Sequence, residues 1–178
     1  LFRSRWYQAT TPHMTTAKET PWRWLPTTYI GTGTAQAAIA TLALLLYKQL
    51  GLGNAEITFY TGWLFLPWLL RPLWSPFVGL IRTPRWWIVA MQLMLGVALG
   101  GVAFTIPTAH WLQGTLFFLV LLAFALAIHE TEVDIFYHDT LGKAMRTGLA
   151  GMPGIFRLLA FIFVQGFLVM VVGNLQLL

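Results

Sequence analysis

Long apolar runs separated by short polar stretches dominate the chain. Five of these runs reach the length of about 20 mostly apolar residues that an α-helix needs to cross a lipid bilayer. The apolar positions are continuous rather than alternating, which favours helices over strands. The pattern therefore predicts an all-α membrane protein whose five transmembrane helices cover about 25–47, 57–78, 86–106, 112–137 and 147–172.

The linkers between these runs are short and rich in turn residues, at 51–54, 82–85, 107–108 and 138–145. Short linkers usually make consecutive helices antiparallel neighbours, so we expect each span to pack against the next. Proline removes a backbone donor and bends a helix. We therefore expect bends at Pro67 and Pro72 in the second span, and at Pro153 in the fifth.

The first 24 residues are polar, and we interpret them as a tail that precedes a transmembrane domain at 25–178. Lys and Arg concentrate in this tail and in the linkers after the second and fourth spans. Basic residues are enriched in cytoplasmic loops of membrane proteins. The distribution therefore predicts a cytoplasmic N-terminus in a multi-pass protein.

The amino-acid composition excludes several classes of protein. Charged residues make up 10% of the chain, against about 25% in soluble domains, which argues against an ordinary soluble protein. The chain has no cysteine, which excludes disulfides and cysteine-based metal or redox sites. We expect no cofactor and no nucleic-acid partner, since the net charge of +5 is explained by basic loops. The expected surroundings are a lipid bilayer.

The fourth span ends in an unusual run of ionisable residues. His129, Glu130, Glu132 and Asp134 follow one another in an otherwise apolar helix. A charge at the centre of a membrane costs about 2.5–3.5 kcal/mol on insertion scales. Two interpretations are open: the helix ends near Ile128 and these groups are wetted, or they lie inside the protein and carry a function.

Arg157 is the natural partner of these carboxylates. It lies inside the apolar run of the fifth span, and counting from the turn places it at a depth similar to that of Glu130. We expect an ion pair between the two, which either fixes helix packing or lines a cavity for substrate and protons. A metal site at His129, Glu130 and Glu132 is disfavoured, because their spacing differs from that of the paired-histidine zinc helix.

Small residues recur in three spans. Gly96 and Gly100 are four apart in the third span, and glycines recur every third residue at 148, 151 and 154. Such spacing predicts close contacts between helices. In the first span, Gly31, Gly33 and Gln36 form a small, polar face that is suited to line a cavity.

The order of several motifs resembles a known family. They are a Trp-rich stretch at 21–27, Tyr47–Gly51, Phe65–Trp68, Arg71–Val78, Thr83–Trp87 and Phe156–Leu158. Together they resemble the N-terminal half of a major facilitator superfamily transporter, in the muropeptide-permease-like group. The implied fold is most of an N-terminal six-helix half.

This resemblance implies a proton-driven secondary transporter in the bacterial inner membrane, with small solutes such as cell-wall sugar–peptides as substrates. Glu130, Asp134 and Arg157 match charged positions of the family, and with His129 and Gln36 they are our candidates for the substrate and proton pathway. Transporters of this kind place the site between two halves. The resemblance therefore also implies a partner, either a missing C-terminal half or another membrane chain.

Three positions depart from the family pattern. Relatives carry an acidic residue at Thr32, a proline at Ala35, and at Gly79 an aspartate that helps to latch the cytoplasmic gate. With Arg82 and Arg85, Gly79 forms the expected gate loop. Two other classes stay open: a non-transporting membrane component that acts only with a partner chain, and an intramembrane enzyme, which we do not expect.

Overall fold

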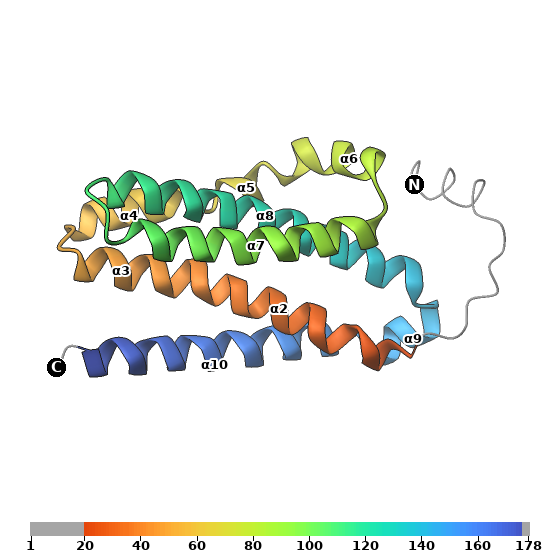
Figure 1. Cartoon of the computed structure of the whole chain (residues 1–178). Coiled ribbons are helices and arrows are strands. Elements are labelled where there is room, and N and C mark those ends of the chain that lie inside the picture. Colours follow the sequence, from red (N-terminus) through yellow and green to blue (C-terminus); the bar gives the residue numbers. More distant parts are fainter. Residues whose placement is uncertain (1–19, 176–178) are drawn as a thin grey trace.

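The computed structural model describes residues 20–175, and every element in this range is helical (Figure 1). Four segments are long and apolar enough to cross a membrane: Pro21–Gln49, Pro84–Thr105, Trp111–Thr140 and Met152–Val171. A bent pair, Asn54–Leu69 and Arg71–Ile81, makes a fifth span if it is counted as one. The predicted all-α architecture is therefore confirmed, with four or five helices of membrane-spanning character.

The first span begins with a short 3-10 helix, η1 (Pro21–Arg23), and continues through α2 (Leu25–Ala37), η2 (Ala38–Leu42) and α3 (Ala43–Gln49). The five residues of η2 form a π-helical turn within the rod. Gly51 then reverses the chain with a φ of 84°, a conformation that side chains other than glycine rarely adopt. The α-helical part of this span begins at Leu25, and the 3-10 helix before it lengthens the span to Pro21.

The second span is broken into α4 (Asn54–Trp63), α5 (Leu66–Leu69) and α6 (Arg71–Ile81). The segment Asn54–Leu69, which holds α4 and α5, is bent by 53° relative to α6. Pro67 and Pro72 each stand in the first turn of a helix, where a missing N–H group leaves no hydrogen bond broken. The bend that the prolines predict is confirmed.

The third and fourth spans form an antiparallel pair, α7 (Pro84–Thr105) and α8 (Trp111–Thr140). They pack extensively against each other, as the short linker predicts. A Cβ atom on Gly101 would lie 2.3 Å from the ring of Phe118, so this glycine permits the close approach. The predicted role of Gly96 and Gly100 is wrong within this chain, because neither has an atom within 4 Å of an added Cβ.

The fifth span differs most from its prediction. The linker contains a separate helix, α9 (Lys143–Gly148), and α10 (Met152–Leu175) begins at Met152 rather than near Thr147. Pro153 is the second residue of α10, so it starts the helix and does not bend it. Gly148, Gly151 and Gly154 have no neighbours within 4 Å of an added Cβ, so their predicted packing role is wrong here too.

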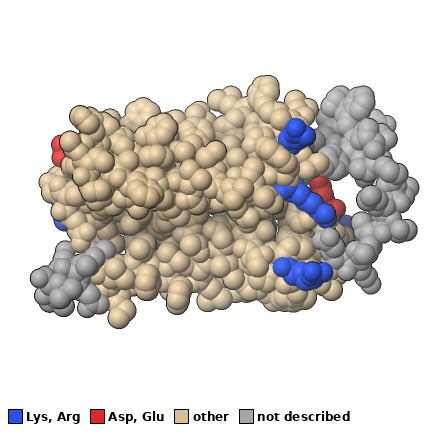
Figure 2. All heavy atoms as spheres, in the orientation of Figure 1, with Lys and Arg blue, Asp and Glu red and all other residues tan. Residues whose placement is uncertain are grey.

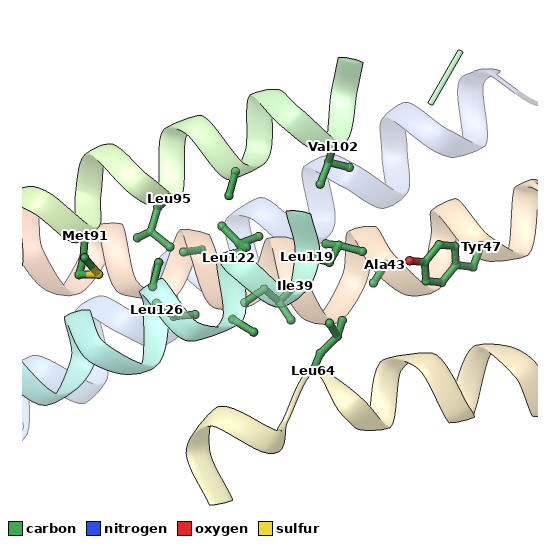
Figure 3. Close-up of a cluster of buried hydrophobic side chains, with 14 of the residues drawn as sticks. Ile39, Ala43, Tyr47, Leu64, Met91, Leu95, Val102, Leu119, Leu122 and Leu126 are labelled. Carbon is green, nitrogen blue, oxygen red and sulfur yellow. The ribbon is translucent and has the colours of Figure 1, made fainter. Parts of the chain in front are cut away.

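The first three spans pack against α8. An apolar core lies between the first span, α7 and α8, with Leu64 approaching from the second span; Figure 3 shows Ile39, Leu95 and Leu122 pointing into it. The fifth span packs mainly against α2 and runs parallel to it (Figure 1), so the expectation that spans four and five are paired neighbours is wrong. The eleven residues of linker at 141–151, which include α9, carry the chain past α8.

Charged side chains mark the two ends of the bundle. Lys and Arg gather at the end that carries the start of α2, the α6–α7 turn and α9 (Figure 2). At the opposite end Lys48 lies beside the start of α4, where its ammonium donates to Asn54 Oδ1 at 2.9 Å. This asymmetry is the one from which the sequence predicts a cytoplasmic N-terminus. Most of the predicted tail, residues 1–19, lies outside the described residues.

Candidate functional site

The fourth span does not end at its ionisable residues. Helix α8 continues without interruption from Trp111 to Thr140. His129 and Glu132 are 0% exposed and Glu130 is 5% exposed. The interpretation that the helix ends near Ile128 is therefore wrong. The polar run stays covered because Val133 and Tyr137, further along α8, belong to a second buried cluster with Leu25 and Tyr29.

His129 faces the first span. Its Nδ1 lies 3.4 Å from Oγ1 of Thr32, a fully buried residue of α2. The Thr32 hydroxyl donates to the carbonyl oxygen of Thr28 at 2.9 Å, which leaves its oxygen to face the imidazole. The other ring nitrogen, Nε2, is buried and has no hydrogen-bond partner among the described residues. Thr32 thus contacts the candidate site from α2.

Glu130 faces the broken second span. Nε1 of Trp68 donates to its Oε2 at 2.8 Å. Trp68 belongs to the short helix α5, so the break around Pro67 delivers this donor to the carboxylate. The second oxygen, Oε1, is buried without a hydrogen-bond partner in the part of the chain that the structure describes. One half of the carboxylate is therefore held by protein, and the other has unused acceptor capacity.

Asp134 lies one turn beyond Glu130 and is partly exposed. NH2 of Arg71 lies 3.5 Å from Oδ2, and the Tyr29 hydroxyl donates to Oδ1 at 3.3 Å. The two charged side chains are 34% and 45% exposed, for Arg71 and Asp134 respectively. Asp134 thus connects the first, second and fourth spans at the edge of the buried segment.

Arg157 does not pair with Glu130. Its guanidinium carbon lies 5.6 Å from the ring centroid of Tyr29, and no ion pair joins it to an acid within residues 20–175. Counting 1.5 Å per residue, Arg157 is about 8 Å from the start of α10, whereas Glu130 is about 15 Å from the end of α8. The late start of α10 and its packing against α2 explain why the expected pair is absent.

The other predicted residues lie on α2 and near the junction of α6 and α7. Gln36 is half-buried on α2, one turn beyond Thr32. In the expected gate loop, the Arg82 guanidinium lies 5.8 Å from the ring centroid of Trp86, and Arg85 lies 5.2 Å from that of Phe136. Gly79 is half-buried near the end of α6. Within the described range, no group of three or more His, Cys, Asp or Glu side chains is close enough to hold a metal ion.

Sequence reasoning did not find the residues that hold these groups. Trp68 and Tyr29 act as hydrogen-bond donors, and Arg71 pairs with Asp134. Tryptophan and tyrosine are common in membrane helices, so their type alone gives no signal, and only the packing of three helices brings them to the carboxylates.

Comparison with known proteins adds no family to this geometry. No protein-family model matches the chain, and no solved structure matches it. The length and apolar composition of its helices are those of a membrane protein. Any finer assignment rests on the buried polar residues.

Proposed function

We propose that this chain is part of a proton-coupled secondary transporter of the major facilitator type. It acts in the bacterial inner membrane with its N-terminus in the cytoplasm, and it moves small solutes such as muropeptides. One observation carries the proposal: His129, Glu130 and Glu132 are buried within an uninterrupted apolar helix of membrane-spanning length. Ionisable residues at such positions typically mark ion and substrate pathways.

The chemistry of this segment suits proton transfer. Imidazole and carboxylate groups both take up and release protons. Oε1 of Glu130 and Nε2 of His129 keep acceptor positions unfilled among the described residues, whereas Trp68 and Thr32 occupy the other positions. The held atoms fix each side chain, and the remaining atoms are available to water or to a proton in transit.

The exposure of α10 supports the need for a partner. Ala160 is its only buried residue up to Val171, and large apolar side chains such as Leu159, Phe163 and Phe167 are exposed. A helix with so little coverage by its own bundle either faces lipid or adjoins further helices. The proposal places additional helices there, from the same polypeptide or from another chain.

Uptake of a labelled muropeptide into proteoliposomes tests this function. The intact protein should accumulate the solute when an inward proton gradient is imposed, and a protonophore should abolish accumulation. Glu130→Gln should lose gradient-driven accumulation, because an amide cannot carry the proton. Asp139→Asn, an exposed carboxylate on the same helix, is the matched control and should behave as the wild type. Full accumulation by Glu130→Gln would rule out this proton pathway, and no gradient-dependent uptake by the wild type would rule out the transport proposal for muropeptides.

A second candidate is a non-transporting component that acts with a partner chain. The same exposed surface of α10 favours it, because that surface suits a permanent helix–helix contact. It predicts that the double variant Glu130→Gln, Arg157→Gln leaves assembly and phenotype intact. Loss of phenotype with normal assembly would exclude it.

A further inference from the structure

Arg157 is a partly buried cation to which the described residues supply no hydrogen-bond acceptor. Its Nε is buried and has no hydrogen-bond partner among the described residues, and the contact made by its guanidinium is with the ring face of Tyr29. An arginine side chain carries five N–H donors in a fixed fork that matches carboxylate and phosphate groups. A ring face attracts the charge but fills none of these donor positions.

The position of Arg157 is fixed by its backbone. A Cβ atom on Gly33 would lie 2.2 Å from the carbonyl oxygen of Arg157 and 3.0 Å from Cβ of Ala160, so only glycine permits this approach of α10 to α2. Helical side chains lean toward the N-terminus of their helix. Because the two helices are parallel, Arg157 leans from the level of Gly33 toward Tyr29, one turn earlier on α2.

The neighbouring acid is already engaged. Asp134 accepts from the Tyr29 hydroxyl at 3.3 Å and lies 3.5 Å from the Arg71 guanidinium. Tyr29 therefore stands between Asp134, which contacts its hydroxyl, and Arg157, which contacts its ring. This group of side chains contains two arginines and one aspartate, so it has one more positive than negative formal charge.

We infer that Arg157 and Tyr29 form an oxyanion-binding subsite that takes a carboxylate or phosphate group. The guanidinium fork binds the oxyanion, and the Tyr29 ring holds the fork in place. As an account of the transported substrate, this inference rests on the proposed function, and it specifies an anionic solute. The subsite lies about 8 Å from the start of α10, at the end of the bundle where Lys and Arg gather (Figure 2), and this positive charge would attract an anion.

Thermal unfolding in a maltoside detergent tests the subsite without requiring transport. The detergent carries no anionic group, and the probes are inorganic phosphate, acetate and short-chain phosphatidylglycerol, each compared with chloride at equal ionic strength. Phosphate or acetate at ten times its dissociation constant should raise the unfolding midpoint of the intact protein by about 3 °C. A shift with phosphatidylglycerol alone would support the subsite and assign its oxyanion to a lipid headgroup.

Two pairs of variants separate binding from general stability. Arg157→Gln should lose the shift, whereas Lys143→Gln removes one exposed charge at the same end and should keep it. Tyr29→Phe retains the ring and should keep most of the shift, and Tyr29→Leu should lose most of it. Arg157→Lys keeps the charge without the fork and should show a smaller shift, which gives a measurement if Arg157→Gln does not fold.

Two results would overturn the subsite: no probe shifts the wild type, or Arg157→Gln and Arg157→Lys both respond as strongly as the wild type does. The uptake experiment separates this failure from failure of the proposed function. Anion binding without gradient-driven uptake would leave the subsite standing and reject transport of that solute. Uptake without anion binding would reject the subsite and leave the transport proposal standing.

Discussion

The two halves of α8 are buried to a similar degree by different means. In the half before Ile128, Leu119, Leu122 and Leu126 are 0% exposed and lie in the apolar core. In the half after it, His129 and Glu132 are equally buried in the same helix. The first half is covered by apolar side chains of the first span and α7. The second half meets Thr32, Trp68 and Arg71, which are supplied by α2, α5 and α6.

Under the proposed function, this difference separates stability from function within one helix. Apolar burial stabilises the bundle wherever it occurs. Burying a polar group is costly unless the group finds a partner, so stability alone does not explain why a membrane helix buries several ionisable side chains. The broken second span supplies partners for two of these side chains, since α5 contributes Trp68 and α6 begins with Arg71. Three substitutions test whether the two halves really differ in this way.

The largest loss of stability is expected in the apolar half. Leu126→Ala removes a fully buried side chain from the core and should lower the free energy of unfolding by about 2–5 kcal/mol. SDS-induced unfolding in mixed micelles measures this change. Leu159→Ala on α10, where the side chain is 60% exposed, is the control and should change stability by less than about 0.5 kcal/mol. Equal losses in the two variants would mean that α8 is not the centre of the bundle.

An intermediate loss is expected where Trp68 meets Glu130. Trp68→Phe removes the indole donor from a buried carboxylate oxygen, which should cost about 1–3 kcal/mol. The loss of stability caused by Trp68→Phe should be smaller in a Glu130→Gln background, because both substitutions disturb the same contact. Trp74→Phe, which removes a bond from Nε1 to the carbonyl oxygen of Pro67, should not couple to Glu130. Strict additivity of Trp68→Phe with Glu130→Gln would exclude this hydrogen bond.

The smallest loss is expected at the edge of the polar half. Asp134→Asn breaks the pair with Arg71, and both side chains are more than one third exposed. Solvent screening should limit the cost to about 0–1 kcal/mol. Raising the salt concentration should bring the wild type closer to the variant, since exposed pairs are screened. A loss that exceeds that of Trp68→Phe and does not depend on salt would place Asp134 in the buried segment.

Sequence patterns predicted the parts of this fold that depend on local chemistry. Apolar run length located the spans, and Pro67 and Pro72 located the break in the second. The start of α10 was missed because Leu149, Ala150 and Gly151 continue the apolar pattern although they form a turn between α9 and α10. Because α10 starts later than predicted, Arg157 lies closer to the beginning of its helix than expected, and therefore not at the depth of Glu130.

The candidate site was only half visible in the sequence. An ionisable residue in an apolar run is conspicuous, so His129, Glu130, Asp134 and Arg157 could be named. Their partners depend on which helices adjoin and how each is rotated about its axis. The contacts from Thr32 to His129 and from Trp68 to Glu130 join residues 97 and 62 positions apart, so no local pattern records them.

Aqueous access to position 130 tests the central claim most directly. The chain contains no cysteine, so single cysteines report one position each. In the intact protein in energised membrane vesicles, Glu130→Cys and Leu126→Cys place thiols one turn apart on α8, and Asp139→Cys is an exposed positive control. A membrane-impermeant thiol reagent should label positions 139 and 130 but not 126, because the proposed transport cycle opens only the polar half of α8 to water. Labelling at 139 with no reaction at 130 would contradict a proton and solute pathway through this helix.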